Sequence, residues 1–167
     1  IDIAKKLVGG GADVVCMCCN TAHYSYDEIV KYSGVDMINL IEEVVGEVKK
    51  QNVRSVGLIA SEGCLMGRVY ERYFDEIFAE CSIIYPEDQF QKLVTQGICN
   101  IKNATRFDLA SEHHPRNIFD KVRNHLISRG ADIVVVGCTD VRVAYYDERN
   151  IDSLEVMSDL LIRIANE

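Results

Sequence analysis

The hydrophobic pattern of the chain alternates between strand-like and helical stretches from end to end. Short apolar runs predict strands at 13–18, 36–40, 54–60, 82–85 and 132–136. Apolar positions at helical spacing predict helices over 1–9, 23–32, 41–51, 65–80, 87–102, 115–129 and 153–166, joined in part by polar connections at 103–114 and 144–150. Because strands alternate with helices, the pattern predicts an α/β fold with parallel sheets flanked by helices.

Two stretches of this pattern are similar to each other. "LVGGGADVVCMCCNT" and "HLISRGADIVVVGCT" both have a helical end, then Gly-Ala-Asp, an apolar run and a cysteine. An offset of 119 residues aligns Gly11 with Gly130 and Cys19 with Cys138. A helix, a glycine and a strand in this order are common in α/β proteins, but the matching cysteine favours a real repeat.

The repeat predicts two similar lobes, each with its own parallel sheet. We expect the first lobe to comprise residues 1–52 together with 147–167, and the second to comprise 53–146. In each lobe a cysteine follows the end of a strand, which is where open α/β sheets bind ligands. We therefore expect the active site in the cleft between the lobes.

Net charge, the length of apolar runs and the cysteine content limit which partners and which cellular compartment the sequence predicts. The net charge of −8 argues against nucleic acid or an anionic membrane as the main partner. No apolar run approaches the length of a membrane span. Seven cysteines in a chain of 167 residues, 48% of them apolar, indicate free thiols in a reducing cytoplasm rather than a disulfide framework.

The chain begins at Ile1, inside a helical pattern that has no capping residue before it. We expect that residues upstream of Ile1 are missing from this sequence and that the first lobe is incomplete.

The cysteines that lack a partner in the repeat have a simpler interpretation. Cys16 and Cys18 occupy alternate positions of the first predicted strand and are expected to be small buried hydrophobic residues. A zinc site made by Cys16, Cys18, Cys19 and His23 is the alternative, but the spacing is weak for it, so no metal is expected. Cys64, Cys81 and Cys99 are interpreted as packing residues, and His113-His114 as solvated.

Two thiols facing one ligand suit proton transfer at carbon. One thiolate can remove a proton from one face of an α-carbon while the other thiol delivers a proton to the opposite face, which inverts the configuration. Hydrogen-bond donors in the loops after the strands can lower the pKa of such thiols. Asn20, Thr21 and Thr139 directly follow the two cysteines and could hold an α-carboxylate.

"CNTAH" at 19–23 and "GCTD" at 137–140 resemble the paired cysteine motifs of the aspartate/glutamate racemase family. "YSYDEI", "LIEE" and "VGLIASEG" are more similar to its aspartate racemase branch. The resemblance implies interconversion of L- and D-aspartate or glutamate without pyridoxal phosphate or any other cofactor. It assigns acid/base roles to Cys19 and Cys138 and carboxylate binding to Asn20, Thr21 and Thr139. It also implies that Lys102 binds the acidic side chain and that Gly63 and Cys64 lie near the substrate.

The chain departs from the family pattern at three places. Cys64 stands where the family usually has threonine after Gly63, and Asp140 stands where glutamate is frequent. The family also opens with two further strand–helix units, on the order of 60 residues. We therefore keep two alternatives open: a truncated, inactive racemase-like fragment or binding module, and another cofactor-independent racemase or isomerase. The expected partners are a small amino-acid substrate and a second copy of the chain in a homodimer.

Overall fold

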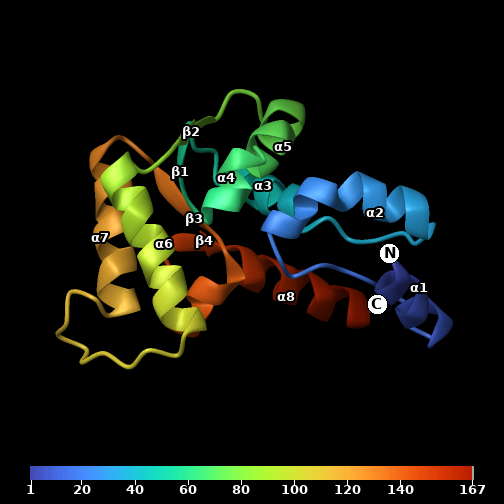
Figure 1. The fold of residues 1–167 in the computed structure, drawn as a ribbon. Helices are drawn as coiled ribbons and strands as arrows, with labels where there is room; N and C mark the ends of the chain where they lie inside the picture. Colours follow the sequence, from blue (N-terminus) through green and yellow to red (C-terminus); the bar gives the residue numbers. More distant parts are fainter. Residues whose placement is uncertain (167) are drawn as a thin grey trace.

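A computed structural model describes residues 1–166 of the chain (Figure 1). The helices and strands follow the predicted alternation. The α-helices are α1 (Asp2–Gly9), α2 (Tyr26–Ser33), α3 (Leu40–Lys50), α4 (Glu62–Met66), α5 (Val69–Ile77), α6 (Asp88–Lys102), α7 (Pro115–Ser128) and α8 (Ser153–Ala165). Two 3-10 helices are η1 (Thr21–Ser25) and η2 (Thr139–Val143), and the strands are β1 (Ser55–Ala60), β2 (Ser82–Ile84), β3 (Ile133–Gly137) and β4 (Asn150–Asp152).

The four strands form one parallel sheet in the order β2-β1-β3-β4. Side-chain alternation sends neighbouring residues of β1 and β3 to opposite faces. Leu58 and Val135 pack with α3 and α5, whereas Ile59, Val134 and Val136 pack against α6 and α7. Figure 1 shows α6 and α7 side by side on one face of this sheet, with α3, α5 and α8 on the other side. The predicted α/β fold with a parallel sheet flanked by helices is confirmed.

The segment 13–18 is not the buried strand that its apolar residues predict. It makes a single parallel bridge, between Cys16 and Ile38, and only Val15 of the segment is buried. The predicted strand at 36–40 is limited to the same bridge. An apolar run becomes a strand only where a neighbouring backbone completes a ladder of hydrogen bonds, and here one position has such a neighbour.

Three further elements differ from the sequence pattern. The helix expected over 65–80 is two helices, α4 and α5, since Arg68 between them adopts a left-handed backbone with φ of 49°. The helix expected over 23–32 begins as η1 and continues as α2. Strand β4 lies at the end of the stretch predicted as a connection and pairs with β3.

The division into two lobes stays a prediction. Among residues 1–166 the sheet of the first lobe is represented by the one bridge between Cys16 and Ile38. β4 and α8 lie within the part of the chain expected in the first lobe, yet β4 extends the main sheet and α8 packs on α3. In the part of the chain that the structure describes, no helix is both long and apolar enough to cross a membrane.

Candidate active site

Cys19 is exposed and lies at the end of the extended segment, just before η1. His23 holds the main chain at this point. Its Nδ1 lies 2.9 Å from the carbonyl oxygen of Cys19, and its Nε2 accepts a hydrogen bond of 3.2 Å from the amide of Leu40. The second contact requires an unprotonated Nε2, so we assign the neutral tautomer in which Nδ1 carries the proton and donates to Cys19. Burial lowers the pKa of His23, which agrees with a neutral ring.

Asn20 is buried, with 2% of its surface exposed, and its side-chain amide makes hydrogen bonds to two distant elements. Its Oδ1 accepts a hydrogen bond of 2.7 Å from the hydroxyl of Tyr70, and its Nδ2 donates to Ser153 Oγ at 3.0 Å. These two hydrogen bonds connect the cysteine loop with α5 and α8. Asn20 therefore fixes the loop in place, whatever further contact its second amide hydrogen makes.

Thr21 contacts the loop that follows β1. Its hydroxyl lies 2.9 Å from Ser61 Oγ, and Ser61 in turn caps α4 by accepting from the amide of Cys64. A Cβ at Gly63 would come within 3.3 Å of the Thr21 methyl group. Glycine at position 63 thus allows α4 and η1 to approach closely.

Cys138 follows β3 directly and precedes η2, in which Thr139 is the first residue. The thiol is half-buried. Burial raises its pKa, whereas the main-chain amides of Asp140 and Val141 lower it by favouring the thiolate. The negative charge of Asp140 raises the pKa of Cys138 further, and the positive charge of Lys102 opposes this effect.

Cys19 and Cys138 both contribute to the pKa of the same two side chains. Burial raises the pKa of Cys64 to about 12, and the charges of Glu71, Cys138 and Cys19 contribute to this shift. The pKa of Lys102 is raised first by its hydrogen bond to Asp140 and then, in small part, by both Cys138 and Cys19. The two cysteine loops also share a structural partner, since the hydroxyl of Tyr70 lies 2.7 Å from Oδ1 of Asn20, the residue after Cys19, and its ring packs against Gly137, the residue before Cys138.

Lys102 ends α6 and its Nζ lies 3.1 Å from Oδ2 of Asp140 in η2. Both side chains are partly exposed to solvent. The ion pair joins the end of α6 to the segment that follows Cys138.

The sequence model of the Asp/Glu/Hydantoin racemase family matches residues 1–156. The chain belongs to this family. Among the curated proteins it is 28% identical, over 141 residues, to the "Broad specificity amino-acid racemase RacX" of Bacillus subtilis (strain 168). That match covers 84% of this chain and 58% of the relative, so the chain spans less than two thirds of the relative's length.

Solved structures of other proteins share the fold of this family member. The aspartate racemase of Picrophilus torridus superposes with a TM-score of 0.78 at 23% identity, covering 98% of this chain and 66% of that one. The glutamate racemase of Francisella tularensis, solved with D-glutamate, gives a TM-score of 0.63 at 15% identity, covering 98% and 61%. At these identities the likeness concerns the fold alone.

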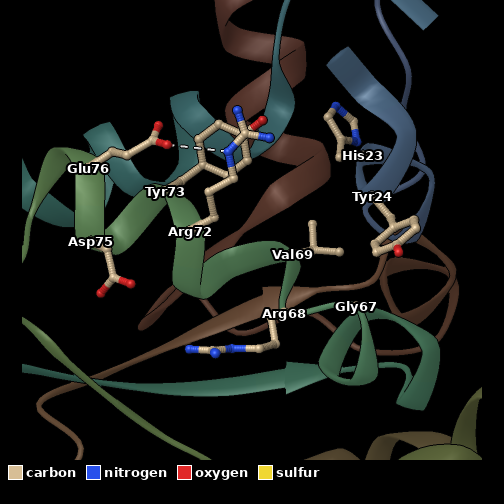
Figure 2. A pocket seen from close by; sticks show the side chains of 9 residues that line it. All are labelled: His23, Tyr24, Gly67, Arg68, Val69, Arg72, Tyr73, Asp75 and Glu76. Atoms are coloured by element: carbon tan, nitrogen blue, oxygen red, sulfur yellow. Dashed lines mark hydrogen bonds and ion pairs between the residues drawn. The ribbon is translucent and has the colours of Figure 1, made fainter. Parts of the chain in front are cut away.

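This racemase-family chain also has a cavity of about 480 Å³, and Figure 2 shows the side chains that line it. It lies between η1 and α5 and is lined by His23, Tyr24, Gly67, Arg68, Val69, Arg72, Tyr73, Asp75 and Glu76. Its central cation is already paired, because Arg72 binds both Glu76 and Asp27. None of the residues expected to do chemistry lines this cavity, and we locate the candidate active site at the two thiols instead.

The exposure of the other cysteines differs in part from the burial that the sequence predicts. Cys18 is exposed and Cys16 is half-buried, so the prediction that both are buried packing residues is wrong for Cys18. Cys64 and Cys81 are buried as expected, whereas Cys99 is exposed on α6. Over residues 1–166, no group of three or more His, Cys, Asp or Glu side chains is arranged to hold a metal ion.

Sequence reasoning missed the residues that support the cysteine loops. Tyr70, Ser153 and Ser61 come from three different elements, and each makes a side-chain hydrogen bond to Asn20 or Thr21. Tyr70 also packs under Gly137, where a Cβ would come within 2.8 Å of the ring. The glycine before Cys138 was the available sequence signal, since it allows a close approach of another group to that strand end.

Proposed function

We propose that this chain carries the two-base active site of an amino-acid racemase, with Cys19 and Cys138 as the acid/base pair. The observation that supports this best is that Tyr70 hydrogen-bonds to Asn20, beside Cys19, and packs against Gly137, beside Cys138, in a chain that belongs to a racemase family. A single nucleophilic cysteine would need no second thiol at the same place.

In the proposed reaction the substrate's α-carbon lies between the two sulfur atoms. One thiolate takes the α-proton, and the electron pair of the broken C–H bond moves onto the α-carbon and its carboxylate. The other thiol then gives its proton to the opposite face and becomes the thiolate. Each turnover leaves the two cysteines with exchanged protonation states, so the reverse reaction uses the same groups in the opposite order.

The environment of Cys138 favours the proton-donor role at the start of the reaction. Burial raises the pKa of Cys138, which keeps the thiol protonated near neutral pH. The amides of Asp140 and Val141 stabilise the thiolate that forms when the proton has been delivered. Cys19 is exposed and takes the role of base for this direction of the reaction.

The hydroxyls of Thr21 and Thr139 and the loop amides are the groups we assign to the α-carboxylate. Asn20 supports them through its hydrogen bonds to Tyr70 and Ser153 and has one amide hydrogen left for the substrate. Gly63 and Cys64 form the wall next to Thr21. This scheme supplies both an acid and a base from the chain itself, so we propose that it works without pyridoxal phosphate or a metal ion.

Exchange of the α-hydrogen in D₂O tests the scheme directly. We expect Cys19→Ala and Cys138→Ala each to abolish racemisation, while each retains slow deuterium incorporation into a different enantiomer. Cys99→Ala is the matched control, because Cys99 is an exposed thiol on α6 that has no counterpart in the repeat. Equal exchange of both enantiomers in either variant would contradict the two-base scheme.

The substrate panel for this assay follows from the family and the relative. L-aspartate and L-glutamate come first, a 5-substituted hydantoin covers the third substrate class in the family's description, and neutral and basic amino acids cover the broad specificity in the relative's name. Racemisation of none of these would favour the alternative that the chain is an inactive fragment or a binding module.

We further propose that the protein is a homodimer and resides in the cytoplasm. Several apolar side chains of α1 and the following segment are exposed, among them Ile3, Leu7 and Val14, and such surface favours association with a second copy. All seven cysteines are free thiols, which is typical of a reducing compartment.

A further inference from the structure

Tyr70 is a fully buried residue of α5 that contacts both cysteine loops. Its hydroxyl donates a hydrogen bond of 2.7 Å to Oδ1 of Asn20, the residue after Cys19. Its ring lies against Gly137, the residue before Cys138, where a Cβ would come within 2.8 Å of Cε2 and 3.0 Å of the hydroxyl oxygen of Tyr70. One side chain therefore bridges the two main-chain segments that carry the proposed reacting thiols.

The partners of Tyr70 are themselves held in place on their far sides. Asn20 donates through Nδ2 to Ser153 Oγ at 3.0 Å, and Gly137 is the last residue of β3, paired with Ala60 of β1. Burial raises the pKa of Tyr70 well above its ordinary value, so the hydroxyl keeps its proton and remains a donor to Asn20. Since a packed interior leaves little room for adjustment, the ring of Tyr70 fixes the distance between the two segments.

Inversion at carbon depends on this distance more strongly than proton removal does. One thiolate can break the C–H bond of a substrate by itself. The configuration inverts only if the second thiol is near the opposite face before the first thiol returns a proton to the face from which it came. A relative shift of the two loops by about 1 Å would therefore slow delivery from the opposite face and leave return to the same face possible.

We propose that Tyr70 is a positioning residue that sets the separation of the two thiols and so determines whether the removed proton is replaced on the opposite face or on the same face. This inference rests on the proposed racemase function. Tyr70 acts through Asn20 and Gly137 and transfers no proton itself.

The test follows each pure enantiomer of aspartate in D₂O and measures two initial rates. One is formation of the other enantiomer, and the second is deuterium incorporation into the enantiomer supplied. If the wild-type protein does not racemise aspartate, the member of the substrate panel that it racemises fastest takes its place. The ratio of incorporation to inversion reports how often the proton is replaced on the same face.

Tyr70→Phe removes the hydroxyl and keeps the ring. We expect inversion to slow about tenfold, and the ratio of incorporation to inversion to rise by a similar factor, because removal of the proton by one thiol continues. KM should change little, since Tyr70 is assigned no contact with the substrate. Gly137→Ala is the second variant, because its added methyl group displaces the ring of Tyr70 from the side of β3, and it should raise the same ratio.

Tyr73→Phe is the matched control. Tyr73 is a buried residue of the same helix, and its hydroxyl accepts a hydrogen bond of 2.7 Å from Nδ2 of Asn39, the residue that caps α3. The substitution removes a buried Tyr–Asn hydrogen bond of the same kind, but from a partner that does not adjoin either proposed reacting thiol. Urea unfolding compares the stability lost by Tyr70→Phe and Tyr73→Phe, and the control should leave the ratio unchanged.

An equal rise of the ratio in Tyr73→Phe would assign the effect to general loosening of the fold and overturn the positioning role. An unchanged ratio in Tyr70→Phe or in Gly137→Ala, with racemisation retained, would overturn that role and leave the proposed function intact. Absence of racemisation of the whole substrate panel by the wild-type protein would overturn the proposed function and this inference together.

Discussion

At the scale of single residues, the seven thiols occupy sharply different environments. Cys18, Cys19 and Cys99 are exposed, Cys16 and Cys138 are half-buried, and Cys64 and Cys81 are buried. Burial is also the main cause that raises the pKa of Cys64 to about 12 and that of Cys81 to about 11. Since the thiolate is the reactive form, exposure and pKa together predict the order in which the thiols react.

We expect iodoacetamide at pH 7.5 to alkylate the three exposed thiols first and Cys138 more slowly. Cys64 and Cys81 should react only after the protein is unfolded, because at this pH almost none of either thiol is ionised. Mass spectrometry of peptides taken at successive times measures the order. Alkylation of Cys64 in the folded protein at the rate of Cys99 would contradict this placement.

His23 should make the stability of the fold depend on pH. Its pKa is lowered from the ordinary value of 6.5, so between the lowered value and about pH 6.5 the unfolded chain binds more protons than the folded protein. The free energy of unfolding should therefore fall as the pH falls below about 6.5. Urea unfolding at a series of pH values from about 5 to 8 measures this slope.

His23→Gln isolates the contribution of the imidazole. The variant should lose about 1–3 kcal/mol at pH 7.5, because buried partners are left without a hydrogen bond, and it should show a flatter pH dependence. His113→Gln is the control, since His113 is exposed in the 103–114 loop. If the control flattened the curve as much as His23→Gln, His23 would not be the source of the slope.

At the scale of elements, the contact between α6 and α7 depends on the absence of a side chain at Gly97. A Cβ at this position would come within 2.7 Å of Cζ of Phe119, which is fully buried. Gly97→Ala should therefore destabilise the protein by about 1–3 kcal/mol despite the better helix propensity of alanine. The midpoint of urea unfolding, with an unchanged slope, measures the loss.

Gly46→Ala is the matched control for Gly97→Ala. Gly46 is also in the middle of a helix, α3, but a Cβ there would have no neighbour within 4 Å. The substitution should stabilise the protein by about 0.5–1 kcal/mol. Equal effects of the two substitutions would show that close packing against Phe119 does not limit position 97.

Strands that lie as apolar runs between two helical stretches could be predicted from the sequence. β1 and β3 are apolar runs that lie between helices and pair with each other over five positions, so composition was a sufficient guide. The run at 13–18 is also apolar, but whether it forms a strand depends on which backbone lies beside it. β4 was missed because three residues carry no periodicity, and its place is fixed by contacts such as that of Asn150 with Arg123.

Of the candidate site, only the two proposed reacting groups could be predicted from the sequence. The repeat identified Cys19 and Cys138, because both follow the same Gly-Ala-Asp phrase at equal spacing. Tyr70 and Ser153 could not be found in this way, since their contact with Asn20 spans 50 and 133 positions in the chain. The pairing of Lys102 with Asp140 likewise depends on how α6 packs against η2.

At the scale of the whole molecule, one group of exposed apolar side chains belongs to the helices at the two chain ends. Ile3 is 75% exposed and Ile162 is 61% exposed. A small cavity of about 240 Å³ nearby is lined in part by Val14 and Ile164. This region is the part of the described surface that we expect to bind a second copy.

The double substitution Ile3→Lys and Leu7→Lys should weaken self-association, because it places two positive charges on the apolar side of α1. Sedimentation velocity at micromolar concentrations should show a dimer for the wild-type protein and a shift toward monomer for the variant. Leu109→Lys, at an exposed apolar position in the 103–114 loop, should leave the dimer intact. A wild-type protein that sediments as a monomer at all concentrations would contradict the proposed homodimer.

The hydrogen-bonded chain from Tyr70 through Asn20 to Ser153 constrains how this protein can diverge during evolution. Replacing Tyr70 by phenylalanine would leave Oδ1 of Asn20 buried without its donor, and replacing Ser153 by alanine would leave Nδ2 of Asn20 without its acceptor. A single change at any of the three positions therefore destabilises the fold, even where it leaves the reacting groups unchanged. In natural relatives these positions should be inherited as a unit or be exchanged together, even where the cysteines beside them are lost.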